Sequence, residues 1–502
     1  MHELFRDLFV FDVANNHEGS VEHGLKIVNA VGRIARQHGI RAGIKFQYRD
    51  LDTFIHPDFR TRDDIQHIRR FLSTRLTKTG FLTLLQAVRE QGLLTVVTPF
   101  DEASVDTCLD HGVQVIKVAS CSANDWPLLE KIATTNRPVI VSTGGLSIYD
   151  IDNVVSFFTH KEMEFALMHC VSLYPTPNGR VQLNFLERMI KRYPRIPVGY
   201  SGHEEPDNLD VVKIAVAKGA TLLERHVGVP TDTIRLNRYS MSPEQAEAWV
   251  ASALLAKEIC GGNGYDRQID QAEVESLLSL KRGVYAAVDI QQGSVIRRQD
   301  VFFAMPCVEG QTTSGEFGRY RTRWVASRDY RRHEPIFEYQ PADTPDMIGI
   351  MRGVIHDAKG MLYEANIEIG KDFEIELSHH CGLEHFRRIG ALIINLINRE
   401  YCKKLIVMLP GQQHPRHYHK RKEETFQLLS GDLEVCLENG IIQMHPGDKL
   451  LIERGTPHSF TTRRGAIFEE ISTTHLANDS VYEDERINRL DPIQRKTILK
   501  EW

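Results

Sequence analysis

Residues 7–260 alternate between short β-branched runs and longer helical segments, and this alternation constrains the fold more than any other feature. The runs are nearly continuous in apolar residues, as strands buried on both faces are. Eight runs occur, at residues 7–14, 42–47, 94–100, 113–120, 137–145, 165–172, 197–203 and 221–228. Eight strand–helix units predict an α/β fold, a (β/α)8 TIM barrel over residues 1–262. A doubly wound open sheet is the alternative, but no GxGxxG motif follows the first run.

The composition indicates a soluble globular protein, since 42% of the 502 residues are hydrophobic and 25% are charged. A chain of this length is too long to fold around a single hydrophobic core, so we expect several domains. With a net charge of -6 and no basic stripe, nucleic acid is not an expected partner. We find no membrane helix and no signal peptide pattern. The eight cysteines form no CxxC pair, which predicts free thiols and a cytoplasmic location.

Two smaller domains are predicted after the barrel. Residues 261–276 are polar and predict a linker, and residues 279–342 contain hairpin-like strands around a Gly turn. From residue 345 to 480 short strands with regular turn signals predict an all-β domain. Residues 481–502 are polar and predict a peripheral tail.

For two segments of this last domain we also predict the secondary structure. Residues 353–370 predict two strands around a Lys-Gly turn, and residues 383–401 predict a helix.

Polar residues gather at the carboxyl ends of the predicted barrel strands, where barrel enzymes hold their active sites. Lys45 and Lys117 lie inside apolar strands, where an unpaired charge is expensive. His203 and His226 end the seventh and eighth strands. Each residue alone is more often structural than functional, but their joint occurrence favours function. Lysines and hydroxyls suit a small phosphate-carboxylate anion, and two imidazoles suit a divalent metal with open positions.

Eight short motifs occur in order along the barrel: NNHEGS, IKFQ, TPF, IKVAS, VSTGG, MHCVSLYPTP, GYSGH and LLERH. Together they resemble the motif series of the sialic acid synthase family, which condenses phosphoenolpyruvate with a sugar aldehyde. The resemblance covers about residues 1–342. It implies that residues 279–342 form that family's antifreeze-like (SAF, β-clip) domain, which caps the barrel of the partner in a homodimer.

The resemblance also implies roles for residues at matching positions. The implied catalytic residues are Asp12, Lys45, Lys117, Tyr174, His203 and His226. The implied binding residues for phosphoenolpyruvate and the sugar are Asn16, Gln47, Thr98, Phe100, Ser120, Ser142, Ser172 and Ser201. His203 and His226 would hold Mn2+ or Mg2+. The product would be a 2-keto-3-deoxy (ulosonic, sialic-acid-like) acid for polysaccharide biosynthesis.

Several positions depart from the family pattern. Asp12 stands where the family has Glu, Ser122 where it has an acidic residue, and Ser172 where it has Asn. Met305 falls where the antifreeze-like domain offers an Arg to the sugar. The phosphoenolpyruvate half of the site therefore matches the family and the sugar half does not, so we expect an acceptor other than N-acetylmannosamine.

The C-terminal region contains both cupin motifs. Gly411, His417, His419, Glu424 and Gly431 have first-motif spacing, G-x5-H-x-H-x4-E-x6-G. Gly447, Gly455 and His458 have second-motif spacing. The two histidines at i and i+2 share one face of a strand, and Glu424 and His458 would complete a three-nitrogen, one-oxygen metal site. This predicts an all-β cupin (jelly-roll) domain over 345–480 that binds Mn2+, Zn2+, Fe2+ or Co2+.

Three further residues near the cupin motifs are predicted to be an alternative ligand or surface residues. Glu423 would replace Glu424 as the ligand if the strand register shifted, and His414 and His445 are predicted on the surface. A metal-free cupin used for packing is the alternative.

The segment EYCKKLIVMLPGQQHPRHYHKRKEETF resembles sugar-isomerase cupins, close to D-lyxose isomerase. This implies that the cupin isomerises a ketose to the aldose that the barrel condenses with phosphoenolpyruvate. Three alternatives stay open: a synthase with a sugar-binding regulatory cupin, a catalytically inactive synthase-like sugar sensor, which Ser122 favours, and a different barrel lyase or aldolase.

Overall fold

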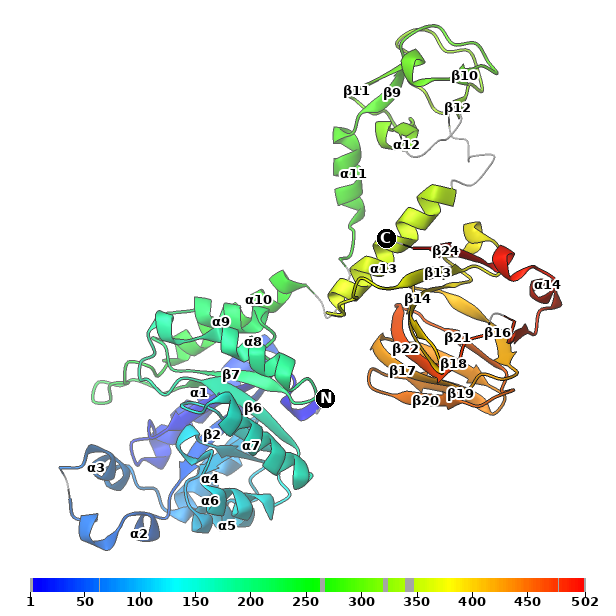
Figure 1. The fold of residues 1–502 in the computed structure, drawn as a ribbon. Helices are drawn as coiled ribbons and strands as arrows, with labels where there is room; N and C mark the ends of the chain where they lie inside the picture. Colours follow the sequence, from blue (N-terminus) through cyan, green and yellow to red (C-terminus); the bar gives the residue numbers. More distant parts are fainter. Residues whose placement is uncertain are drawn as a thin grey trace. The chain divides into compact units, whose positions relative to one another are not determined.

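The computed structural model describes residues 3–62, 64–261, 267–318, 324–338, 347–476 and 478–500. The chain divides into two compact units, residues 1–267 and 268–502 (Figure 1). Within the described ranges, no helix combines the length and the apolar character needed to cross a membrane.

The first unit contains a closed parallel barrel of eight strands, which confirms the predicted (β/α)8 fold (Figure 1). The strands are β1 (Leu8–Ala14), β2 (Arg41–Tyr48), β3 (Leu94–Pro99), β4 (Val115–Val118), β5 (Val139–Ser142), β6 (Phe165–Cys170), β7 (Val198–Gly202) and β8 (Leu222–His226). Strand β1 pairs with both β2 and β8, which closes the barrel.

Helices follow the strands and cover the outside of the barrel. They are α1 (Val21–His38), α4 (Lys78–Glu90), α5 (Glu102–Asp110), α6 (Trp126–Ala133), α7 (Ile148–His160), α8 (Leu183–Arg192), α9 (Asp210–Ala217) and α10 (Pro243–Cys260). The connection from β2 to α4 also carries the short helices α2 (Leu51–Phe54) and α3 (Gln66–Ser73). Phe9 and Phe11 point outward from β1 and meet the buried Trp249 of α10 edge-on, as alternating strand residues on the helix-covered face should.

The last part of the predicted 261–276 linker is helical, residues 267–270 are irregular, and residues 262–266 lie outside the described residues. Helix α11 (Gln271–Leu280) starts after Asp270, whose side chain accepts a hydrogen bond from the Ala272 amide and caps the helix. Two short antiparallel pairs follow, β9 (Gly283–Ala286) with β11 (Val301–Ala304) and β10 (Val295–Ile296) with β12 (Trp324–Val325); α12 (Ser314–Gly318) lies between β11 and β12 in the chain.

The C-terminal domain contains two antiparallel sheets, the arrangement of a cupin jelly roll. One sheet has the order β20-β17-β22-β15-β14-β13-β24 and the other β19-β18-β21-β16-β23. The strands are β13 (Glu374–Ser378), β14 (Ala391–Asn398), β15 (Tyr401–Met408), β16 (Gln413–His419), β17 (Glu424–Gly431), β18 (Leu433–Leu437), β19 (Gly440–Met444), β20 (Lys449–Ile452), β21 (His458–Thr461), β22 (Ala466–Thr473), β23 (Ser480–Tyr482) and β24 (Lys496–Leu499).

Two secondary-structure predictions in this domain were wrong. Residues 353–370 were predicted as strands, but α13 (Met347–Glu364) covers most of them, because Val354, Ala358 and Leu362 repeat every four residues and bury one helical face. Residues 383–401 were predicted as a helix, but β14 covers 391–398. Its β-branched residues pair along β13 and β15.

The C-terminal tail is part of the cupin and not peripheral as predicted. Strand β23 pairs with β16, and β24 pairs with β13. Helix α14 (Glu485–Asn488) connects these two strands. The polar composition of the tail hid these strands, because each is short and only half buried.

Replacing Leu499 with Asp should destabilise the cupin, because Leu499 packs against the core that contains Ile375 and Leu377. We expect the free energy of unfolding to fall by roughly 1–3 kcal/mol, because a carboxylate would replace an apolar contact with the core. Ile498 is the matched control, since it is 47% exposed and lies next to Leu499 on the opposite face. Equal unfolding free energies for Leu499→Asp and Ile498→Asp in urea denaturation would contradict the role of β24.

Candidate functional site

The inward face of the barrel changes from apolar to polar as the strands approach their carboxyl ends. Leu8, Val115, Ile140 and Leu222 belong to a closed apolar cluster inside the barrel. Alternate residues of a strand share a face, so the polar residues that follow two or four positions later also point inward. These residues are Asp12, Lys117, Ser142 and Glu224.

The carboxylate of Glu224 is the point on which the buried polar residues converge. Its Oε1 atom lies 2.9 Å from Lys45 Nζ and 3.3 Å from Lys117 Nζ. Ser201 Oγ donates to the same oxygen at 2.9 Å, and Lys117 Nζ donates to Ser142 Oγ at 2.5 Å. These five residues come from five different strands and are all buried. The cluster therefore forms only when the barrel closes.

Two carboxylates balance the two buried ammonium groups. Burial disfavours a charged Lys45, but Asp12, whose Oδ2 lies 3.0 Å away, and Glu224 raise its pKa above the ordinary value. For Lys117 burial prevails and lowers the pKa, against the attraction of Glu224. Burial opposes ionisation of Glu224, yet the two lysines hold the pKa of its carboxyl well below the usual range. The charge of Lys117 is therefore less fully balanced by carboxylates than the charge of Lys45.

The two predicted strand-end histidines lie side by side, with ring centroids 5.4 Å apart. His203 Nδ1 donates to the carbonyl oxygen of Val171 at 3.0 Å, which leaves Nε2 as the lone-pair nitrogen. His226 Nε2 lies 3.4 Å from Asp12 Oδ2. Burial, with His226 nearby, lowers the pKa of His203 to about 3, and burial also lowers the pKa of His226. Both imidazoles are thus neutral at pH 7, the form that ligates metals.

Aromatic rings and hydroxyls complete the surroundings of these imidazoles. The Tyr174 ring lies 4.4 Å from that of His203, and the Tyr239 ring lies 5.1 Å from that of His226. A Cβ at Gly144 would lie 2.5 Å from Ser172 Oγ and 2.7 Å from Ser120 Oγ, so only glycine fits between these hydroxyls.

The other predicted binding residues are placed differently. Asn16 donates to the Val227 carbonyl at 2.9 Å and to Ser240 Oγ at 3.0 Å, so its amide ties two barrel loops together. Thr98 Oγ1 is buried without a hydrogen-bond partner among the residues that the structure describes. Gln47 and Phe100 both contact Arg49.

Sequence reasoning gave Glu224 no role, although its position carried a signal. An acidic residue two positions before His226 in a buried strand must face the barrel interior, where two buried lysines need a counter-ion. The position of Tyr239 beside His226 could not be predicted in this way, because Tyr239 lies outside the regular strands.

The four predicted cupin ligands meet in the second site. His417, His419 and His458 place one nitrogen each within 4.8 Å of one another, and all three are buried. Glu424 Oε1 lies 3.2 Å from His419 Nε2, and its Oε2 lies 3.3 Å from His458 Nε2. Glu424 is buried and Glu423 is only half-buried, so Glu424 is the carboxylate that faces the imidazoles.

The donor set of the cupin site fits a metal ion. His417 Nδ1 donates to the Pro415 carbonyl and His458 Nδ1 to the Thr456 carbonyl, both at 3.0 Å. These hydrogen bonds leave Nε2 of each ring with a free lone pair that can bind a metal. His458 Nε2 and Glu424 Oε2 are buried and make no hydrogen bond within the described chain, which a cation between them would remedy.

Sequence reasoning missed a buried lysine–glutamate pair next to this site. Lys422 Nζ contacts the Glu424 carboxylate and lies 2.9 Å from Glu470 Oε1. Lys404 Nζ lies 3.4 Å from the same Glu470 oxygen. Lys422 is two positions from Glu424, so strand alternation could have suggested that both face the same side. Nothing in the sequence pointed to Glu470 on β22 as its partner.

The surface prediction for His414 was wrong. His414 is buried, its Nε2 lies 3.0 Å from His380 Nε2, and its ring stacks on Phe460. A register shift between His414 and His417 turns His414 to the interior, although an odd spacing places it outside in a regular strand. The side chain of His445 is 80% exposed, as predicted.

The comparisons with known proteins agree with both domains. The NeuB family model matches residues 33–264, and the cupin domain model matches residues 404–468. The fold and the site thus define a barrel of the sialic acid synthase type joined to a cupin.

Individual relatives place the chain within that class. A crystal structure from Chromobacterium violaceum, named as a spore coat polysaccharide biosynthesis protein E, is 41% identical, has a TM-score of 0.64, and covers 67% of this chain and 100% of its own. N-acetylneuraminate-9-phosphate synthase of Drosophila melanogaster is 29% identical over 325 residues, 58% of this chain and 85% of the relative. N,N'-diacetyllegionaminic acid synthase of Legionella pneumophila is 25% identical over 305 residues, 58% and 83% of the two chains. The chain belongs to the NeuB family and carries a C-terminal cupin domain.

Replacing Glu224 with Gln should destabilise the barrel, because two buried ammonium groups lose their shared counter-ion. We expect the free energy of unfolding to fall by roughly 3–5 kcal/mol, as when one partner of a buried ion pair is removed. The double variant Lys117→Met, Glu224→Gln should recover part of this loss, since it removes one of the stranded charges. Urea denaturation of the three proteins measures this, and wild-type stability of the single variant would contradict the counter-ion role.

Proposed function

We propose that the barrel condenses phosphoenolpyruvate with an aldose, giving a 2-keto-3-deoxy (ulosonic) acid and phosphate. The observation that carries the proposal is the convergence of Lys45, Lys117, Ser142 and Ser201 on one buried point at the carboxyl ends of the strands. Membership of the NeuB family supports it, because relatives at 25–29% identity are named as sialic-acid-type synthases.

The buried lysines would bind the phosphate and carboxylate groups of phosphoenolpyruvate. Their charges stay in place while charge develops on the substrate, so no solvent has to reorganise. C3 of phosphoenolpyruvate would attack the aldehyde carbon, water would add at C2, and the C2–O bond to phosphate would then break. The carboxylate of Asp12 would take a proton from the adding water; its Oδ2 lies 3.0 Å from Lys45 Nζ and 3.4 Å from His226 Nε2.

The neutral imidazoles of His203 and His226 would hold Mn2+ or Mg2+. When bound there, the ion would polarise the aldehyde oxygen of the sugar. A site with two protein ligands leaves positions open for substrate and water, and the open Nε2 of His203 fits this use.

We further propose a cytoplasmic homodimer in which the small domain of one subunit caps the barrel of the other. This rests on the resemblance of residues 279–342 to the antifreeze-like domain. The inactive-sensor alternative is less well supported, because such a sensor has no need to keep Lys45, Lys117 and Glu224 in a buried, charge-balanced cluster.

For the cupin we propose aldose–ketose isomerisation that supplies the aldose to the barrel. The supporting observation is the Lys422–Glu470 pair beside three metal-type histidines. Isomerisation moves a proton between two adjacent carbons and another between their oxygens. Burial opposes the charge of both groups, but Lys404 and Lys422 lower the pKa of Glu470, and Glu470 and Glu424 raise the pKa of Lys422. Glu470 would act as the base at carbon, and Lys422 would donate to oxygen.

The synthase proposal predicts phosphate release from phosphoenolpyruvate that depends on one aldose and on Mn2+ or Mg2+. Lys117→Met should lower kcat/KM at least about 100-fold, the usual effect of losing one charge-stabilising donor. Lys131→Met is the control, since Lys131 pairs with Asp106 at the barrel surface. Release is measured across a panel of aldoses, with mass spectrometry of the products. Absence of release with every aldose would contradict the proposal.

The isomerase proposal predicts that a ketose also supports phosphate release. Glu470→Gln should abolish release from the ketose and keep release from the aldose, because only the cupin step is lost. His445→Gln is the control, since this histidine is exposed. Deuterium incorporation from D2O at the sugar C2 reports the proton transfer directly. Equal loss with ketose and aldose would instead indicate a regulatory cupin.

A further inference from the structure

Arg49 is a half-buried cation without an acidic partner among the described residues. It follows β2, and its guanidinium carbon lies 3.6 Å from the ring centroid of Phe100 and 4.0 Å from that of Phe71. Its Nη2 donates to Gln47 Oε1 at 3.0 Å, and its Nε is buried without a hydrogen-bond partner in the described chain. No carboxylate of the described residues forms an ion pair with Arg49.

Such an arrangement is costly unless another anion completes it. A guanidinium between two aromatic rings loses water from both faces, and a neutral amide does not balance its charge. Burial accordingly lowers the pKa of Arg49 to about 10, against the more distant attraction of Cys121 and Asp12. The planar fork of a guanidinium matches a carboxylate or a phosphate with two parallel hydrogen bonds.

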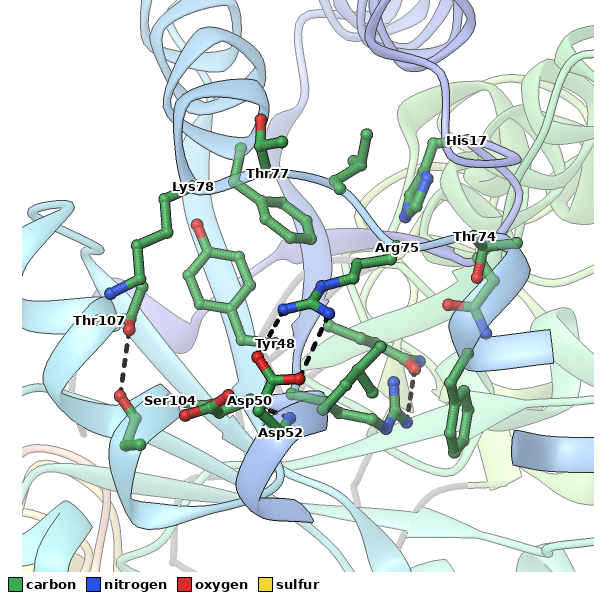
Figure 2. A pocket seen from close by; sticks show the side chains of 18 residues that line it. His17, Tyr48, Asp50, Asp52, Thr74, Arg75, Thr77, Lys78, Ser104 and Thr107 are labelled. Atoms are coloured by element: carbon green, nitrogen blue, oxygen red, sulfur yellow. Dashed lines mark hydrogen bonds and ion pairs between the residues drawn. The ribbon is translucent and has the colours of Figure 1, made fainter. Parts of the chain in front are cut away.

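Arg49 lines a cavity of about 570 Å3 between the carboxyl ends of β1 and β2 and the helices α4 and α5. This volume is in the range of small-molecule pockets. Arg75 also lines the cavity, and Figure 2 shows its guanidinium joined to Asp52, with Nη2 2.9 Å from Oδ2. Three cations thus line the cavity: Arg75 is neutralised by Asp52, whereas Arg49 and Lys78 form no ion pair among the described residues.

The cavity adjoins the proposed phosphoenolpyruvate site through β2. Gln47 lines the cavity and accepts from Arg49, and Lys45, two residues earlier on the same face of the strand, contacts Glu224. A molecule that contacts Gln47 would thus lie two residues along β2 from Lys45, and the second substrate of a condensation has to approach the first.

We propose that this cavity binds the acceptor sugar and that Arg49 recognises an acidic group, a carboxylate or a phosphate, on that sugar. The inference rests on the proposed synthase activity and assigns the chemical class of the acceptor. Arg49 acts here as a specificity-determining residue.

The test compares neutral and acidic forms of the same aldose. Phosphate release from phosphoenolpyruvate is measured with mannose, mannuronate and mannose 6-phosphate, and with the corresponding glucose and N-acetylmannosamine series. We expect kcat/KM for an acidic form to exceed that of its neutral parent at least about tenfold, and Arg49→Gln to lose that preference, as expected when a charge-assisted bidentate pair is removed. Preference for the uronate or for the phosphate distinguishes the two acidic groups.

Arg75→Gln is the matched control, because it removes a paired guanidinium from the same cavity and should keep the preference. The ratio compares two sugars on one protein, so a partly unfolded variant does not distort it. A wild-type preference for neutral sugars, or an unchanged ratio in Arg49→Gln, would overturn the proposal.

If none of the sugars is turned over, the synthase proposal fails and Arg49 is tested by binding alone. Calorimetric titration with mannose 6-phosphate should then show at least about tenfold weaker binding to Arg49→Gln than to the wild type. Equal affinities would overturn the acidic-group assignment independently of the reaction.

Discussion

The ion network around Glu224 is the interaction on which the rest of the barrel site depends. Two ammonium groups lie in a closed interior where an isolated charge is very unfavourable, and they are tolerated because Glu224 and Asp12 neutralise them. The network joins strands that are far apart in the sequence, so barrel closure and assembly of the site are one event. It also holds both lysines in one orientation before any substrate arrives, which is the preorganisation that anion chemistry requires.

The cupin repeats the same physical solution with a different architecture. Lys422 lies between Glu424 and Glu470, as Lys45 lies between Asp12 and Glu224. In each domain the balanced charges stand next to a group of histidine side chains. Under the proposed function, the cupin would rearrange the sugar and the barrel would then form the carbon–carbon bond.

Much of this organisation follows from sequence patterns, and the errors have identifiable causes. The alternation of apolar runs with helical segments predicted the fold, and the position of Lys117 inside an apolar run indicated a functional residue, because an unpaired charge there is expensive. Spacing also predicted His417, His419 and Glu424, which lie close together in the chain.

The failures concern contacts between distant segments and local irregularities. The Lys422–Glu470 pair joins residues 48 positions apart, and nothing local links them. His414 was misplaced because a bulge changes strand alternation, and α13 was missed because its glycines resembled a turn. The sequence did not predict a role for Arg49, because the absence of a neighbouring carboxylate can be seen only in the folded structure.

The most direct test of the central account is calorimetric titration of phosphoenolpyruvate into the full chain. The account predicts one molecule bound per barrel, with affinity at least about tenfold lower in Lys117→Met, because a charge-assisted contact is lost. Lys131→Met should bind like the wild type. Absence of binding to the wild type, or equal affinity in Lys117→Met, would contradict the claim that the Glu224-centred lysines form the phosphoenolpyruvate site.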